Sequence, residues 1–346
     1  MHDDLLEVIE IYRVLREEYD KAIVGLDDVK EKTAIAFLSE IPTTLSAKKS
    51  RRVNAGLVWY MGVPGTGKTY GGLVLAKVTN TNFVRIQGRA DLTPSDIVGV
   101  EIFNPKTGEW EKREGPIVKA QILLLDEGNR IPPKTQSAFL EANQDRTVTI
   151  GDTTIELPEF YFVIMTANPV ETGEGTYPMS DANADRFTFI INVNYLSPNE
   201  EEKLVSFDIK NIDIEPRLKW ERIAQLRSSI TEHVFLHRSL KKYIRRLVVA
   251  SRPYNSEIKN FMHSPSSLVE EFVELGASPR ATMCWGPTSK VRAIIVGKRD
   301  VVYPEDIQTL AKNILGHRIN LKSNAGKRGV TVENVIDDII AKVAVP

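Results

Sequence analysis

The stretch of sequence that decides the fold reads Gly62-Val63-Pro64-Gly65-Thr66-Gly67-Lys68-Thr69. It fits the pattern G-x-x-x-x-G-K-S/T of a phosphate-binding loop, or P-loop. Its glycines let the backbone curl so that successive amides point at phosphate oxygens, and a following helix adds its positive dipole end. Lys68 can reach the β- and γ-phosphates, and the Thr69 hydroxyl can bind Mg²⁺. The stretch therefore predicts a site for ATP and Mg²⁺.

The residues on either side of this loop have the pattern that a P-loop requires. An apolar run at 56–61 is typical of a buried parallel strand, and a helix is predicted at 68–78. Beyond it, apolar strand-like segments alternate with helical ones, which indicates an α/β fold with a parallel sheet. Further strands are expected at 83–86, 121–125, 161–166 and 187–193, and helices at 3–20, from a cap at Asp27 or Asp28 to about 40, and at 135–143.

A second half of the site follows the predicted strand at 121–125. Asp126 and Glu127 stand directly after that strand, at the carboxyl end where open α/β sheets bind ligands. Asp126 can hold Mg²⁺ directly or through water, and Glu127 can orient and polarise the attacking water. Together with the P-loop, these two carboxylates predict ATP hydrolysis.

Three further polar residues could compensate charge during phosphoryl transfer. Asn168 follows a predicted strand, Arg186 precedes the last one, and Arg280 lies at the start of a predicted helix. An Asn at such a position also suits a turn or cap, and an Arg also suits a surface ion pair. Spacing alone leaves these alternatives open.

The sequence pattern changes near residue 196. Residues 1–196 form the predicted α/β nucleotide-binding domain, and residues 197–346 have helical periodicity without strong strand runs. Two of the clearest helices in the second part are expected at 236–250 and 290–298. The sequence therefore predicts a P-loop domain followed by a helical, lid-like domain.

Composition and charge limit the possible functions. Of the 346 residues, 42% are hydrophobic and 26% are charged, and the formal net charge is −1, so bulk attraction to nucleic acid or to an anionic membrane is not expected. Cys284 is the single cysteine, which excludes an intrachain disulfide and favours a small buried side chain over a catalytic thiol. No run approaches the roughly 18 apolar residues of a spanning helix, and the N-terminus lacks the apolar core of a signal peptide. We expect a soluble, cytoplasmic protein that binds no membrane.

Further short stretches stand in a fixed order around the P-loop and the two acids. They read Ile23-Val24-Gly25, Arg85-Ile86-Gln87, Asp91-Leu92-Thr93-Pro94-Ser95-Asp96-Ile97, Gly115-Pro116-Ile117, Thr166-Ala167-Asn168-Pro169, Asp185-Arg186-Phe187, Gly276-Ala277-Ser278-Pro279-Arg280-Ala281 and Gly316-His317-Arg318-Ile319. In this order they resemble the MoxR group of AAA+ ATPases along nearly the whole chain. So many ordered matches are much more specific than a P-loop alone. The resemblance implies an AAA+ parallel-sheet ATPase domain with an all-α lid domain.

The resemblance also implies roles for individual residues. Asn168 resembles the sensor-1 residue that positions the lytic water. Arg186 resembles the arginine finger, which acts on ATP bound by the next subunit, and Arg280 resembles the sensor-2 residue that the lid carries onto the γ-phosphate. Ile23 and Val24 would line the adenine pocket.

Two turn sequences flanked by strand-like residues predict β-hairpins at 98–114 and 147–157. The resemblance identifies them with an insertion within helix 2, near 95–117, and one before sensor 1, near 147–157. In this group such hairpins face a central pore, which makes them candidates for contacting a client protein.

A finger that acts in trans requires a head-to-tail ring, and relatives usually form hexamers. The family's usual partners are proteins with von Willebrand A domains. Its work is remodelling or maturing client proteins, often with insertion of a metal cofactor. Some positions depart from the family pattern: Gly67 stands where relatives often have Ala and restores the general P-loop form, Leu26 stands where they often have Gln, and Gly128 where they often have Ile. The segment 252–275 is longer than the family's usual lid connection, and the sequence gives it no role.

Two alternatives use the same ATPase core, a DNA-dependent motor or translocase subunit and a magnesium-chelatase-type subunit. The hairpin at 98–114 carries Lys106, Lys112 and Arg113, but four glutamates oppose them. Such mixed charge is typical of a solvated hairpin rather than of a DNA-reading arm. The sequence therefore favours a chaperone-like ATPase over a nucleic-acid partner, whereas a chelatase subunit would need partners that one chain does not reveal.

Overall fold

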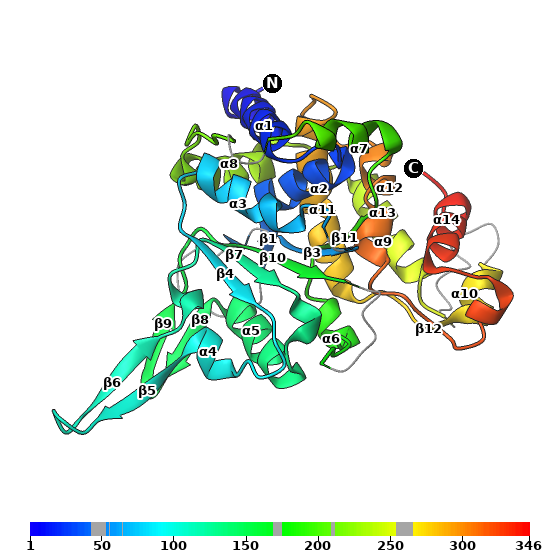
Figure 1. Ribbon diagram of the computed structural model, residues 1–346. Helices are drawn as coiled ribbons and strands as arrows, with labels where there is room; N and C mark the ends of the chain where they lie inside the picture. Colours follow the sequence, from blue (N-terminus) through cyan, green and yellow to red (C-terminus); the bar gives the residue numbers. More distant parts are fainter. Residues whose placement is uncertain (43–52, 55, 64, 169–174, 209–211, 254–265) are drawn as a thin grey trace.

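The computed structural model describes residues 1–42, 53–54, 56–63, 65–168, 175–208, 212–253 and 266–346. Pro64 of the P-loop therefore lies outside the described residues. Figure 1 shows an α/β body, a group of helices beside it and a long hairpin that projects from the body.

Five parallel strands form the central sheet, in the order β11-β3-β10-β7-β4. The inner strands β3, β10 and β7 are buried along almost their whole length, because helices cover both faces of the sheet. The strands are β3 (Leu57–Gly62), β4 (Phe83–Gln87), β7 (Ile122–Asp126), β10 (Phe162–Ala167) and β11 (Phe189–Val193). The predicted α/β fold with a parallel sheet is confirmed, and the strand ends lie within two residues of those expected.

Each face of the sheet has its own apolar core, because successive side chains of a strand point to opposite faces. On β3, Val58 and Tyr60 pack with helices α1, α2 and α3, whereas Leu57 and Trp59 pack on the side of α5. Figure 1 shows these two layers of helices on either side of the strands. The helices are α1 (Asp3–Ala22), α2 (Asp27–Leu38), α3 (Lys68–Val78) and α5 (Pro133–Asp145).

The start of α2 corrects one expectation. Leu26 precedes the helix in a left-handed conformation (φ 56°) without a side-chain cap, so neither Asp27 nor Asp28 caps it. Both carboxylates are engaged by cations instead, Asp27 by Arg16 at 2.5 Å and Asp28 by Lys32. Their negative charge in the first turn still favours the helix dipole.

The two predicted β-hairpins are confirmed. Strand β5 (Gly99–Asn104) pairs with β6 (Glu109–Glu114), and β8 (Thr147–Ile150) pairs with β9 (Thr153–Glu156), both antiparallel. Figure 1 shows them together at the lower left, next to α4 (Pro94–Val98). Lys112 of the first hairpin binds Asp152 in the turn of the second, with 2.5 Å between Nζ and Oδ1.

The second half of the chain is mainly helical, as predicted, but one helix differs from expectation. Instead of the expected 290–298, α11 begins at Pro279 and ends at Ile295. Gly286 and Pro287 inside it obscure the helical pattern of its first half. The other helices are α7 (Pro198–Val205), α8 (Trp220–His233), α9 (Arg238–Ala250), α10 (Ser267–Phe272), α12 (Pro304–Gln308), α13 (Ala311–Leu315) and α14 (Val332–Lys342).

Several short elements connect these helices and strands. Two of them, β12 (Val273–Leu275) and β13 (Asn320–Leu321), pair antiparallel and were not expected from the sequence. The others are β1 (Ile41–Pro42), β2 (Val53–Asn54) and α6 (Asp181–Ala184), with the 3₁₀ turns η1 (Pro116–Val118), η2 (Gly128–Arg130) and η5 (Gly326–Arg328). No helix in the described ranges is both long and apolar enough to cross a membrane.

The N-terminal helices α1 and α2 share an apolar core with the later helices α8 and α11. At this junction the buried Arg227 of α8 donates from Nε to the carbonyl oxygen of Phe37 at the end of α2, at 2.9 Å. Its guanidinium lies 4.5 Å from the ring centre of Phe160. Burial lowers the pKa of Arg227 to about 9. The two halves of the chain are therefore joined by a continuous apolar core.

We expect Asp306→Ala to lower the free energy of unfolding by about 3 kcal/mol, because it removes the buried carboxylate that pairs with two arginines. Asp306 is fully buried and accepts from Arg292 and Arg299, each at 2.7 Å. Chemical denaturation measures the loss. The control is Asp337→Ala, since Asp337 pairs with Lys312 at 2.8 Å with both side chains half exposed, and such a pair contributes about 0–1 kcal/mol. Equal losses in the two variants would contradict the expectation.

Candidate ATP site and arginine cluster

The P-loop connects the end of β3 to the start of α3. Gly65 and Gly67 have φ angles of 81° and 77°, a left-handed conformation that side chains other than glycine rarely adopt. Gly67 is also the N-cap of α3, so the loop delivers its amides to a helix N-terminus. This arrangement is the anion-binding geometry that the sequence pattern predicts.

A cavity of about 380 Å³ lies over the P-loop. It brings together most of the residues that the sequence predicts for the site. These are Ile23, Val24, Gly65, Thr66, Gly67, Lys68, Thr69, Asp126, Glu127 and Asn168. The first two are apolar, Asp126 is the last residue of β7 and Glu127 follows it, and Asn168 follows β10. Gly62 and Val63 do not line the cavity, but both supply carbonyl oxygens to the Lys68 ammonium, Val63 at 2.9 Å.

Asp126 is held by contacts from three neighbouring elements. Its Oδ1 accepts a 2.5 Å bond from the Thr166 hydroxyl on β10. Its Oδ2 lies 3.4 Å from the Thr69 hydroxyl and accepts from Arg85 on β4, at 2.5 Å from Nη2. The Asp126 side chain is 11% exposed, so these partners set its orientation.

The donors near Asp126 are suited to Mg²⁺. Thr69 and Asp126 offer a hydroxyl and a carboxylate, and hard cations such as Mg²⁺ take oxygen ligands of this kind, completed by water and substrate phosphates. The described part of the chain holds no cluster of three or more His, Cys, Asp and Glu side chains that could bind a metal. This oxygen pair fits a Mg²⁺ ion whose remaining ligands would come from nucleotide phosphates and water.

Glu127 begins a turn directly after β7. Its backbone is left-handed (φ 53°), and its amide donates to the Thr166 hydroxyl at 3.0 Å. Its carboxylate lines the cavity and pairs with Arg130 at 3.0 Å. Thr166 therefore binds both acids of the site, through the side chain of Asp126 and the main chain of Glu127.

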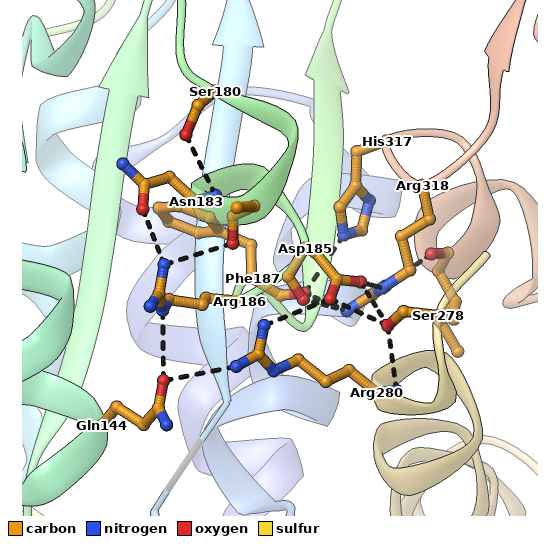
Figure 2. Close-up of polar contacts among 12 residues, drawn as sticks. Gln144, Ser180, Asn183, Asp185, Arg186, Phe187, Ser278, Arg280, His317 and Arg318 are labelled. Carbon is orange, nitrogen blue, oxygen red and sulfur yellow. Dashed lines mark hydrogen bonds and ion pairs between the residues drawn. The ribbon is translucent and has the colours of Figure 1, made fainter. Parts of the chain in front are cut away.

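Arg186 and Arg280 meet at Gln144, outside the P-loop cavity (Figure 2). Arg186 donates from Nε to Gln144 Oε1 at 3.1 Å, and Arg280 donates from Nη2 to the same oxygen at 3.4 Å. Both line a separate cavity of about 120 Å³. Burial, together with the nearby charge of Arg280, lowers the pKa of Arg186. The structure brings these two predicted residues together, and neither lines the P-loop cavity, so the sensor-2 role of Arg280 stays a prediction.

Asp185 connects this arginine cluster to the helical half. Its carboxylate accepts from Arg280 at 3.2 Å, from Arg318 at 3.0 Å and from the Ser278 hydroxyl at 2.7 Å (Figure 2). Arg318 also donates to the carbonyl oxygens of Asp185 and Phe187. Ser278, Arg280 and Arg318 all belong to the second half of the chain, after residue 196. Asp185, which lies shortly before β11, therefore connects the sheet to the start of α11.

Two neighbours of the cluster are uncharged, the partly buried His317 and the buried Cys284. His317 donates from Nε2 to the Phe187 carbonyl oxygen at 3.1 Å, and desolvation of the ring holds its pKa well below the ordinary value. Cys284 is buried beside the smaller cavity, and burial raises the pKa of its thiol, which agrees with the expected inert packing role.

Sequence reasoning missed several residues of both sites. Arg85 was noticed only as part of a family stretch, and Thr166 and Gln144 were given no role. Leu204 and Phe207, from α7 and the turn after it, also line the P-loop cavity and were missed. The alternation of side chains along β4 was the available signal, because it places Arg85 and Gln87 on the same face of the strand. An arginine near the end of one strand predicts an ion pair when a neighbouring strand ends in an acid.

Comparison with known proteins agrees with this fold and site. Residues 57–189 match the family model described as the ATPase family associated with various cellular activities (AAA), and residues 266–339 match the AAA lid domain. The chain is 39% identical to the uncharacterized protein YeaC of Bacillus subtilis over 333 residues, covering 95% of this chain and 93% of YeaC. It is 34% identical to the chaperone MoxR1 of Mycobacterium tuberculosis over 334 residues, covering 95% of this chain and 81% of MoxR1.

A solved structure supports the same conclusion. The crystal structure of a candidate ATPase from Cytophaga hutchinsonii superposes with a TM-score of 0.84 at 33% identity, and the match covers 99% of this chain and 97% of that one. The P-loop cavity and the two family models agree with these whole-chain similarities. The chain therefore belongs to the MoxR family of AAA+ ATPases and is an ATP hydrolase.

Proposed function

We propose that this protein uses ATP hydrolysis for chaperone-like remodelling or maturation of partner proteins, as a hexameric ring. The observation that supports assembly into a ring is the position of Arg186 and Arg280. Both lie at Gln144, and neither lines the P-loop cavity of its own chain. Two adjacent guanidinium groups suit a phosphate group better than a surface ion pair. A neighbouring subunit's γ-phosphate is an anion that such a pair could serve.

Within one subunit, each residue of the cavity has a proposed task. The P-loop amides and Lys68 bind the phosphates, Ile23 and Val24 contact the adenine, and Thr69 with Asp126 holds Mg²⁺, which would supply charge neutralisation. Glu127 orients and polarises the attacking water, and Asn168 positions it. Thr166 supports both acids through its two hydrogen bonds. The pairing of Glu127 with Arg130 has to loosen for that carboxylate to meet water.

The arginine cluster supports hydrolysis in trans. Arg186 would act as the finger, and Arg280, held to it through Gln144, would stabilise the same neighbouring γ-phosphate. A head-to-tail contact of this kind forms a ring when the rotation between successive subunits closes, which is the arrangement that we propose. Asp185 would keep Arg280 in place by an ion pair of 3.2 Å.

The first hairpin supports a protein client. Ile102 on β5 is 46% exposed, and Phe103 and Trp110 form an exposed aromatic pair with ring centres 5.4 Å apart. Exposed apolar groups on a projecting element are typical of protein contacts. The Mycobacterium tuberculosis relative is named a chaperone, which agrees with such a role. A protein with a von Willebrand A domain is the partner that we expect.

We further propose a two-domain organisation with the boundary at residue 196, between β11 and the capped start of α7 at Ser197. Residues 1–196 would be the nucleotide-binding domain and residues 197–346 the lid domain. Helices α1 and α2 pack on both parts. The proposed boundary therefore divides the chain in sequence, but the two parts share one apolar core.

Glu127→Gln should retain ATP while hydrolysis falls by about two to three orders of magnitude, because only the group that polarises water is lost. Lys68→Ala should lose nearly all nucleotide binding, since the ammonium that contacts the phosphates is gone. Nucleotide affinity and single-turnover hydrolysis measure the two effects separately. Turnover of Glu127→Gln at the wild-type rate would show that another residue activates the water.

Mixing Arg186→Ala with Lys68→Ala should restore part of the ATPase activity that each variant lacks alone. In a mixed ring, an intact P-loop of one subunit can face an intact Arg186 of its neighbour. The measurement is ATPase rate against mixing ratio. Mixing Lys68→Ala with Glu127→Gln is the matched control, because in that mixture no subunit combines an intact P-loop with an intact Glu127. Equal rates in both mixtures would rule out action in trans.

Glu127→Gln loaded with ATP should capture a client protein. Wild-type protein should then change the conformation of that client on ATP hydrolysis, which is measured as altered protease sensitivity of the client. Capture should fall at least about tenfold with Phe103→Ser combined with Trp110→Ser, because the aromatic pair is lost. Phe235→Ser is the control, since Phe235 is 57% exposed but lies before α9, away from the hairpin. Strong stimulation of ATPase by DNA, lost as salt rises, would instead favour the motor alternative.

A further inference from the structure

Arg85 reaches the carboxylate of Asp126 from the neighbouring strand. Strands β4 and β7 are parallel neighbours in the sheet, with Gln87 opposite Asp126. From two residues earlier on β4, Arg85 donates to Asp126 Oδ2 through Nη2 at 2.5 Å and through Nε at 3.1 Å. Nη2 also donates to Gln87 Oε1 at 2.8 Å. A guanidinium thus binds one particular oxygen of this acid with two donors.

The two oxygens of Asp126 have different surroundings. Oδ1 is bound to the Thr166 hydroxyl at 2.5 Å, and Thr166 is buried. Oδ2 faces both Arg85 and the Thr69 hydroxyl, which lies 3.4 Å away. If Thr69 and Asp126 hold the metal, as the proposed function states, then Arg85 binds the oxygen that is nearest to the other metal ligand.

A metal ion and a guanidinium repel each other when they share one carboxylate oxygen. Unit charges a few ångströms apart at a protein surface interact by several kcal/mol before screening by solvent. The Arg85 side chain is 50% exposed, so screening reduces the repulsion and the side chain can turn outward into water. Gln87 offers it another acceptor on the same strand. Displacement of Arg85 by a metal is therefore feasible, but it weakens metal binding.

We propose that Arg85 is a built-in counter-cation of the metal site. It neutralises Asp126 Oδ2 when no metal is bound, and it competes with Mg²⁺ for that oxygen when nucleotide brings the metal in. Thr166 keeps the carboxylate in the same orientation in both states, because its bond uses the other oxygen. Arg85 thereby lowers metal affinity without taking part in the chemical step, which makes it a positioning residue.

The test measures metal affinity directly, with Mn²⁺ as the probe and its free-ion electron paramagnetic resonance signal as the readout. The protein is loaded with stoichiometric ADP and titrated with Mn²⁺. Arg85→Gln should bind Mn²⁺ about tenfold more tightly than wild type, because the competing charge is gone. Arg85→Lys should lie between them, since it keeps the charge but loses the second donor. Unchanged or weaker binding by Arg85→Gln would overturn the inference.

Arg89→Gln is the matched control. Arg89 follows four residues later and pairs with Asp91 at 3.0 Å, with both side chains exposed. The variant Arg89→Gln removes the same charge from the same segment but leaves the contact between Arg85 and Asp126 in place. Its Mn²⁺ affinity should therefore equal that of wild type. An equal gain in both variants would assign the effect to net charge and overturn the role of Arg85.

ADP affinity without metal, measured in the presence of a chelator, separates the two levels of the proposal. If wild type binds no ADP, the proposed nucleotide site fails. If ADP binds normally to wild type and to Arg85→Gln but Mn²⁺ affinity does not move, the counter-cation role alone fails. If Arg85→Gln does not fold, as read from its thermal melt, Arg85→Lys decides the question, and an affinity equal to wild type or weaker contradicts the inference.

Discussion

The parallel register of β3, β10 and β7 is the constraint on which the ATP site depends. Met61 lies opposite Ala167, and Met165 lies opposite Leu125, so the three strands end at one edge of the sheet. Because of this register, the P-loop, the two acids and Asn168 emerge side by side although they are distant in sequence. The single hydroxyl of Thr166 then binds the side chain of one acid and the main chain of the other.

Features confined to one stretch of chain were predictable from the sequence. The P-loop, the apolar strand before Asp126 and the two hairpins each have a local signature, so their bounds were predicted within a few residues. The start of α11 was not, because Gly286 and Pro287 interrupt the pattern from which a helix is recognised. The start of α2 at Leu26 was also missed, because the two aspartates that follow it resemble helix caps in sequence but pair with cations in the structure.

Contacts between distant segments were beyond the reach of sequence patterns. The bond between Arg85 and Asp126 depends on which strand lies beside β7, and that order follows from the whole topology. The meeting of Arg186 and Arg280 at Gln144 depends on how α11 docks against the end of the sheet. The family resemblance identified both arginines. Only the structure showed that Gln144 joins them and that neither lines the P-loop cavity.

The apolar core that α1 and α2 share with α8 and α11 has a consequence for any attempt to divide the protein. A fragment that stopped at residue 196 would expose the apolar surfaces through which α1 and α2 contact α8 and α11. Exposed apolar area of this kind promotes aggregation. Because α1 and α2 also pack against α3 and the sheet, a truncation on either side of residue 196 would expose part of this shared core.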